Sequence, residues 1–150
     1  MTKRNEEITE RENREELTSN MEDYLEVIMN LQDEQKVARV KDVASRLKVK
    51  MPSVTGAMKC LAEKGLVNYE RYSYLTLTEA GEKIAREIHD RHKTFYTFLT
   101  EVLGVNRQTA ELDACRLEHA TSYQTFQQLK EFTSEYIQNQ VKPPATRVKK

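Results

Sequence analysis

The sequence predicts a mainly α-helical protein that contains a winged helix-turn-helix: two short helices joined by a tight turn and followed by a β-hairpin. Two observations support this prediction. Apolar residues recur every three or four positions through most of the chain after residue 18, which is the spacing of amphipathic helices. Between residues 41 and 65 two such segments are short and close together, and two β-compatible segments follow them over residues 66–77.

The first helix is expected to begin at Ser19, which forms a capping box with Glu22, and to end at about Gln32. Residues 1–17 are acidic and hold almost no apolar side chains, so we expect them to form a flexible N-terminal segment. The apolar face of the helix is formed by Met21, Tyr24, Leu25, Ile28 and Leu31.

The helix-turn-helix is expected to follow a short β-compatible stretch at residues 37–40. Its first helix covers residues 41–47, its turn residues 48–51, and its second helix begins at Pro52, a residue suited to the first helical position. Gly65 suits the position just after the end of that helix. The residues expected to be buried are Val43, Ala44, Leu47, Val54, Leu61, Ala62 and either Ala57 or Met58.

The wing is expected to pair residues 66–71 with residues 74–77 around a turn at Tyr72-Ser73. Three further helices follow, and each has a capping residue at its start: Thr78, Asn106 and Ser122. The first should end near Gly104 and the second near His119. Their expected apolar residues are Ile84, Ile88, Phe95, Phe98 and Leu99 on the first, and Phe126, Leu129, Phe132 or Thr133, Tyr136 and Ile137 on the last.

The charges of the chain cancel overall but are segregated along it. With 24 basic and 24 acidic residues the net charge is zero, yet residues 1–35 carry −7 and residues 36–74 carry +6. A basic block that coincides with a helix-turn-helix is the electrostatic footprint that binding to the phosphates of DNA needs. The alternative for the charge alone is a solvated lysine-rich surface.

The second helix of a helix-turn-helix presents its N-terminal residues to base edges in the major groove. Small hydroxyls and a glycine there permit close approach, and lysines bind phosphates or guanine. The wing tip, residues 71–74, is a further candidate for contact with the DNA backbone. The expected DNA-binding residues are Arg39, Lys41, Lys50, Pro52, Ser53, Thr55, Gly56 and Lys59.

A second group of residues, separate from the expected DNA-binding residues, is typical of a metal site. Cys115, Glu118 and His119 are spaced i, i+3 and i+4, which places them on one face of a helix. Asp23 and Glu26 are likewise one turn apart, and His92 falls on the apolar stripe of its helix. A thiol, imidazoles and carboxylates that converge would form a mixed site for a divalent transition metal.

Each of these residues also has a structural explanation. Cys115 could be a small buried hydrophobe, His92 a core histidine with satisfied hydrogen bonds, and Asp23 and Glu26 acidic residues that favour an early helical turn. The Cys-Glu-His pattern is more specific, because burying all three without a cation needs three separate compensations. We find no glycine-rich phosphate loop and no catalytic triad pattern, so we expect no enzyme.

Five segments resemble, in the same order, the diphtheria toxin repressor and manganese transport regulator family. They are Asp23-Tyr24-Leu25-Glu26, Pro52-Ser53-Val54-Thr55, Leu75-Thr76-Leu77-Thr78 with Gly81, Arg91-His92 and Cys115-Arg116-Leu117-Glu118-His119. The resemblance covers residues 18–140. It implies a bacterial repressor with an N-terminal winged helix that binds DNA and C-terminal helices that form a homodimer. In that family a divalent metal between the two parts locks the DNA-binding shape.

The resemblance implies a hybrid ligand set. Asp23 and Glu26 follow the manganese branch, whereas Cys115 stands where that branch has glutamate and the iron branch has cysteine. In the iron branch a further glutamate and histidine complete an ancillary site, and this chain departs from that pattern with Tyr96 and Glu111 at the matching positions. In length the chain is closest to the short two-domain manganese regulators. The implied ligands are Asp23, Glu26, His92, Cys115, Glu118 and His119.

Carboxylates and imidazole make Mn²⁺ the first expectation for the metal and Fe²⁺ the next, while the thiolate also suits Zn²⁺ or Co²⁺. The expected domains are residues 1–17 as the acidic segment, 18–85 as the DNA-binding domain, 86–142 as the metal-binding and dimerisation domain, and 143–150 as a basic tail. Two cysteines, Cys60 and Cys115, are too few for a disulfide framework, and the chain shows no secretory signal or membrane span. We therefore expect a cytoplasmic protein.

The expected function is metal-dependent repression of manganese or iron uptake genes. The partners would be a double-stranded DNA operator and a second copy of the chain, with no membrane and no small organic substrate. The alternative is a winged-helix protein-interaction module whose Cys/Glu/His face is structural and metal-free. Titration of metal against DNA binding at fixed salt distinguishes the two.

Overall fold

A computed structural model describes residues 17–70 and 74–141 of the chain. These residues divide into two compact units, of which the first ends at Ile88 and the second begins at His89. None of the helices in the described ranges is long and apolar enough to cross a membrane.

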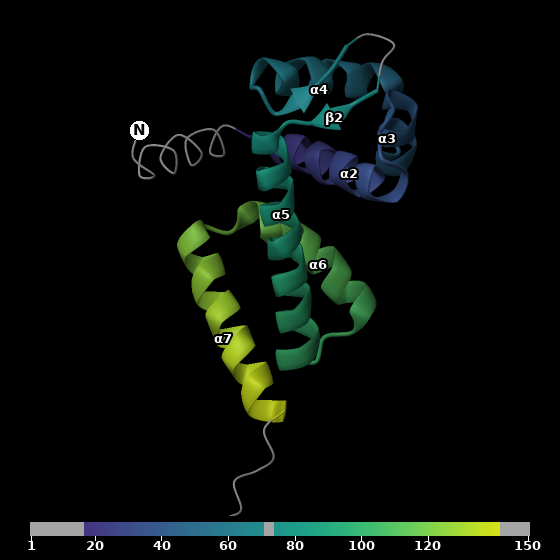
Figure 1. Ribbon diagram of the computed structural model, residues 1–150. Helices are drawn as coiled ribbons and strands as arrows, with labels where there is room; N and C mark the ends of the chain where they lie inside the picture. Colours follow the sequence, from purple (N-terminus) through teal and green to yellow (C-terminus); the bar gives the residue numbers. More distant parts are fainter. Residues whose placement is uncertain (1–16, 71–73, 142–150) are drawn as a thin grey trace, which may run out of the picture. The chain divides into compact units, whose positions relative to one another are not determined.

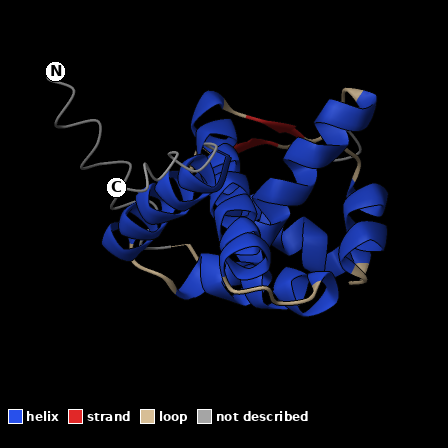
Figure 2. Ribbon diagram, turned by 90° about the horizontal axis from the view of Figure 1, so that it is seen from below, coloured by secondary structure: helices blue, strands red, loops and turns tan. Residues whose placement is uncertain are grey.

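The fold is mainly α-helical with one small antiparallel hairpin, as the sequence predicts (Figures 1 and 2). Helix α5 continues from the first unit into the second and ends in a short π-helical segment. The elements are α2 (Ser19–Gln35), α3 (Val40–Leu47), α4 (Met51–Glu63), β1 (Val67–Asn68), β2 (Thr76–Leu77), α5 (Glu79–Thr97), η1 (Phe98–Val102), α6 (Arg107–Ala120) and α7 (Tyr123–Val141).

Helix α2 begins at Ser19 and is capped by the side chain of Thr18, so the predicted capping box at Ser19 is wrong. The Thr18 backbone is extended, and its hydroxyl accepts a hydrogen bond from the backbone N–H of Met21 at 3.3 Å. Ser19 is already helical. The helix also continues to Gln35, one turn beyond the predicted end, and stops where Lys36 adopts a positive φ of 71°.

The helix-turn-helix is formed by α3 and α4, as predicted, but each helix begins one residue earlier than predicted, at Val40 and at Met51. The turn begins at Lys48, which adopts the left-handed conformation, and Gly65 does so at the end of α4 with φ +72°. Arg46 donates two hydrogen bonds to the Glu34 carboxylate, which join α3 to α2. These bonds hold the pKa of Glu34 below its ordinary value.

Among the described residues the wing is shorter than predicted, because only Val67↔Leu77 and Asn68↔Thr76 pair as strand residues there. The predicted turn at Tyr72-Ser73 lies outside the described residues. Of the β-compatible stretch at residues 37–40, only Ala38 forms a bridge, with Leu75, and Val40 already belongs to α3. The side chain of Gln32 accepts a hydrogen bond from the backbone N–H of Leu77, so α2 also holds the wing.

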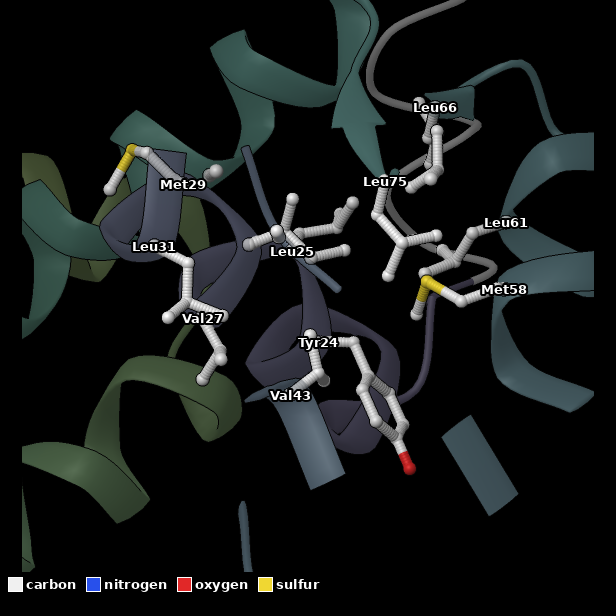
Figure 3. Close-up of a cluster of buried hydrophobic side chains, with 14 of the residues drawn as sticks. Tyr24, Leu25, Val27, Met29, Leu31, Val43, Met58, Leu61, Leu66 and Leu75 are labelled. Atoms are coloured by element: carbon white, nitrogen blue, oxygen red, sulfur yellow. The ribbon is translucent and has the colours of Figure 1, made fainter. Parts of the chain in front are cut away.

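The core of the first unit lies between α2, the helix-turn-helix and the wing (Figure 3). Leu25, Met58, Leu61 and Leu75 are fully buried, and each such side chain contributes about 1.5–3 kcal/mol through removal from water. Of the two residues that the sequence left open, Met58 is the buried one, and Ala57 is only partly buried. This core holds α4 in a fixed orientation against the rest of the unit.

In the second unit α6 and α7 pack beside the C-terminal part of α5 (Figure 1). The predicted caps are confirmed: Thr78 accepts from Gly81 N–H, Asn106 from Thr109 N–H and Ser122 from Thr125 N–H. On α7 the inward residue is Thr133, and Phe132 is exposed. The core consists of Phe95, Leu99, Ala110, Ala114 and Phe126.

Candidate metal centre and nucleic-acid interface

The centre of the candidate metal site is a contact between α5 and α6. Nδ1 of His92 lies 2.7 Å from Oε2 of Glu118, whose side chain is only 2% exposed, and the His92 side chain is 18% exposed. The other carboxylate oxygen of Glu118 lies 3.2 Å from Nε2 of His119, the next residue on α6. A buried carboxylate therefore lies between two imidazoles, which is a donor set that suits a divalent cation.

Cys115 completes a group of three donors. Its Sγ, a ring nitrogen of His92 and a carboxylate oxygen of Glu118 all lie within 4.8 Å of one another. Two atoms bound to one ion at about 2.0–2.3 Å lie at most about 4.6 Å apart, so small side-chain shifts would let all three bind one ion. Cys115 is exposed, which contradicts the alternative explanation of this residue as a small buried hydrophobe.

Glu111 also contacts His92, which the sequence did not predict, because the family resemblance named Glu111 only at an ancillary site. Its Oε1 lies 2.9 Å from Nε2 of His92, so carboxylates contact both ring nitrogens of this histidine. The signal was present in the spacing, because Glu111, Cys115 and Glu118 are i, i+4 and i+7 on α6 and share one helical face. Nevertheless, spacing alone does not show which helix packs against that face.

The two remaining predicted ligands lie in the first unit. Asp23 and Glu26 are one turn apart on α2, and both are half-buried. The structure thus brings together His92, Cys115, Glu118 and His119 within the second unit, while Asp23 and Glu26 belong to the helix that supports the helix-turn-helix.

The predicted DNA-binding residues lie on or beside α3 and α4. Seven of the eight are exposed, and the exception is Thr55, which is half-buried and whose hydroxyl donates to the carbonyl of Met51 at 3.1 Å. The exposed ones are Arg39, Lys41, Lys50, Pro52, Ser53, Gly56 and Lys59. Met51, at the start of α4, is also exposed and was not singled out from the sequence.

At the wing, Arg39 contacts Tyr74. The guanidinium donates a hydrogen bond to the phenol oxygen at 3.3 Å and lies 5.1 Å from the centre of the ring. The neighbouring residues Ala38 and Leu75 form a β-bridge, which places Arg39 and Tyr74 side by side. The remaining candidates at the wing tip, residues 71–73, lie outside the described residues.

The fold and the donor cluster together define a winged-helix protein with a group of side chains that could hold a metal ion. Two family models match the chain: the N-terminal DNA-binding domain of iron-dependent repressors over residues 16–75, and their metal-binding and dimerisation domain over residues 78–141. The chain therefore belongs to the iron-dependent repressor family, which confirms the resemblance to the diphtheria toxin repressor and manganese regulators. The alternative of a metal-free interaction module is not favoured.

Individual relatives agree with this assignment. An uncharacterised helix-turn-helix transcriptional regulator of Methanocaldococcus jannaschii is 38% identical over 80% of this chain and 97% of its own length. The transcriptional regulator MntR of Escherichia coli is 38% identical over 77% of this chain and 74% of its own. A solved manganese-dependent transcriptional repressor in complex with manganese is 30% identical, with a TM-score of 0.70 over 76% of this chain. This chain spans about half of that structure, 52% of its length.

Proposed function

We propose that this chain is a homodimeric, metal-activated repressor that acts in the cytoplasm on genes for manganese or iron uptake. The observation that carries the proposal is the cluster of His92, Cys115 and Glu118, whose donor atoms lie within 4.8 Å of one another in a chain of the iron-dependent repressor family. The matches to the family's DNA-binding and dimerisation domains support the two proposed partners, an operator duplex and a second copy of the chain.

The proposed ligand set extends beyond the observed cluster. His119 contacts Glu118 and is proposed as a fourth ligand, and Asp23 and Glu26 of α2 as the contribution of the first unit. The exposed Cys115 would bind as the thiolate. When bound, the metal supplies a positive charge that holds these carboxylates, imidazoles and thiolate around one centre.

Mn²⁺ is the metal we propose first, because three of the six proposed ligands are carboxylates and two are imidazoles. Fe²⁺ comes next, because the Cys115 thiolate is a softer ligand than Mn²⁺ usually takes. The same thiolate would let Zn²⁺ or Co²⁺ bind in vitro, since both accept sulfur readily.

For DNA, we propose that α4 enters the major groove. Ser53, Thr55 and Gly56 would approach the base edges, where small side chains permit close contact. The Thr55 hydroxyl already donates to Met51, so it would serve as an acceptor toward DNA. The phosphate contacts would come from Arg39, Lys41, Lys50 and Lys59, with Pro52 fixing the start of the helix.

Asp23 and Glu26 lie on the helix that holds both the helix-turn-helix and, through Gln32, the wing. A metal that engages this helix together with the second unit would favour one orientation of the two units. A ligand shifts such an equilibrium only by its different affinity for the two states. Repression would therefore require the metal to bind the DNA-competent arrangement more tightly.

The ligand assignment is tested by metal binding to single variants. We expect His92→Gln and Glu118→Gln to lower the affinity for Mn²⁺ by at least tenfold in a chelator competition titration. His89→Gln is the matched control, because His89 lies on the same helix, three residues earlier, and is exposed. Equal losses in all three variants, or no loss in any, would contradict the proposed site.

A further inference from the structure

Arg91 is a buried cation beside the proposed metal site, and the ligand set does not include it. The residue is only 7% exposed, which is rare for arginine and costly unless the charge is compensated. Nη1 donates to the backbone carbonyl of Glu118 at 3.1 Å and to that of Thr121 at 3.0 Å. The guanidinium also lies 5.2 Å from the centre of the Phe126 ring, on α7.

These contacts stabilise the C-terminal end of α6. The last carbonyls of a helix have no partner within the helix, and its C-terminus carries a partial negative charge. Glu118 belongs to this last turn, because α6 ends at Ala120. Arg91 therefore supplies both a hydrogen-bond donor and a positive charge where the helix needs them.

Two consecutive residues of α5 thus hold the same residue of α6. Arg91 binds the backbone carbonyl of Glu118, and His92 contacts its carboxylate at 2.7 Å. The main chain and the side chain of Glu118 are both fixed relative to α5. Cys115 and His119 lie on the same stretch of α6, so the Arg91 contact also fixes their position along the helix axis relative to His92.

We propose that Arg91 is a positioning residue for the metal site: it sets the register of α6 against α5 so that Cys115, Glu118 and His119 face His92. This inference rests on the proposed function, because it assumes that these residues bind metal. Supporting residues of this kind typically change metal affinity by about 10–100-fold when they are removed.

The sign of the effect separates this role from simple electrostatics. A positive charge repels a metal ion, so Coulomb's law alone predicts that removing the guanidinium strengthens metal binding. The positioning role predicts the opposite, because the ligands lose their alignment. Arg116→Gln is the matched control, because it also removes one positive charge, in this case from α6. The Arg116 side chain is 79% exposed and lies 3.6 Å from the Asp113 carboxylate.

The test measures Mn²⁺ affinity by chelator competition and the visible absorption spectrum of the Co²⁺ complex for the full chain. We expect Arg91→Gln to lower Mn²⁺ affinity about 10–100-fold and to shift the Co²⁺ bands, which report ligand geometry. Arg91→Lys, which keeps the charge and can donate to a carbonyl, should recover part of the affinity. Arg116→Gln should stay within twofold of the parent chain.

Two results would overturn the inference: Arg91→Gln binding Mn²⁺ as tightly as the parent or more tightly, or an unchanged Co²⁺ spectrum. If circular dichroism shows that Arg91→Gln does not fold, the test rests on Arg91→Lys. We then expect the Mn²⁺ affinity of Arg91→Lys to be severalfold lower than that of the parent chain. An affinity equal to that of the parent would contradict the positioning role. If the parent chain itself binds neither metal, the proposed function fails. If the parent binds and the Arg91 variants match it, only the positioning role fails.

Discussion

Gly81 is the residue where the structure makes the sharpest prediction about stability. A Cβ at this position would overlap the carbonyl oxygen of Leu66 and lie 2.9 Å from its carbonyl carbon, whereas carbon atoms pack favourably at about 3.5–4.0 Å. The same carbonyl accepts a hydrogen bond from Thr78 N–H, and the Thr78 hydroxyl caps α5 through Gly81 N–H. Relieving the overlap therefore pulls on both hydrogen bonds at the junction of the wing and α5.

We expect Gly81→Ala to destabilise the first unit by about 2–4 kcal/mol. Loss or weakening of the two hydrogen bonds accounts for about 1 kcal/mol each, and overpacking of backbone against backbone adds about 1–3 kcal/mol. The better helix propensity of alanine returns at most about 1 kcal/mol. Gly56→Ala is the matched control, because a Cβ at Gly56, inside α4, meets nothing within 4 Å. It should gain about 0.5–1 kcal/mol.

Urea unfolding of the metal-free chain, followed by far-ultraviolet circular dichroism, measures both variants. The midpoint should fall for Gly81→Ala and rise slightly for Gly56→Ala, with similar slopes. Two outcomes would refute the reasoning: a neutral Gly81→Ala, or equal destabilisation of the two variants. The second outcome would mean that the contact of a Cβ with the Leu66 carbonyl does not decide the result.

Three further predictions concern the proposed sites. Cys115→Glu should weaken Zn²⁺ and Co²⁺ binding more than Mn²⁺ binding in competition titrations, since it replaces a thiolate with a carboxylate; a parallel change for all metals would remove Cys115 from the ligand set. Lys59→Ala should reduce the slope of log K against log salt for DNA by about 0.9, and the exposed Lys93→Ala on α5 should not. Ser53→Ala should erode discrimination between selected and random duplex while leaving that slope unchanged, and a changed slope would make Ser53 a phosphate contact.

Features with a local chemical cause were predictable from the sequence. The caps at Thr78, Asn106 and Ser122 and the turn at Gly65 depend on one or two residues and lie where expected. The start of α2 was not settled by the same rule, because Thr18 and Ser19 are adjacent and both can cap. Lys36 and Lys48 adopt positive φ, and lysine at a position does not predict that conformation. Both residues are the C-caps of their helices.

In the candidate site, too, features with a local cause were predictable from the sequence, and features that depend on helix packing were not. Helical spacing predicted that Glu118 and His119 share a face with Cys115, and this depends only on α6 being a helix. That His92 meets Glu118 at 2.7 Å depends on how α5 packs against α6, and periodicity does not report it. The same packing explains why Glu111 and Arg91 were missed as partners of this site. Helical spacing placed Asp23 and Glu26 one turn apart, and the family resemblance assigned them to the same site.

The most direct test of metal-dependent DNA binding measures affinity for one duplex with and without metal. The duplex would be selected from a random library by the Mn²⁺-loaded chain, and binding would be followed at fixed salt, with the oligomeric state measured by sedimentation. We expect the EDTA-treated protein to remain dimeric and to bind at least tenfold more weakly, a coupling of about 1.4 kcal/mol or more. Equal affinity in the two conditions would contradict the account.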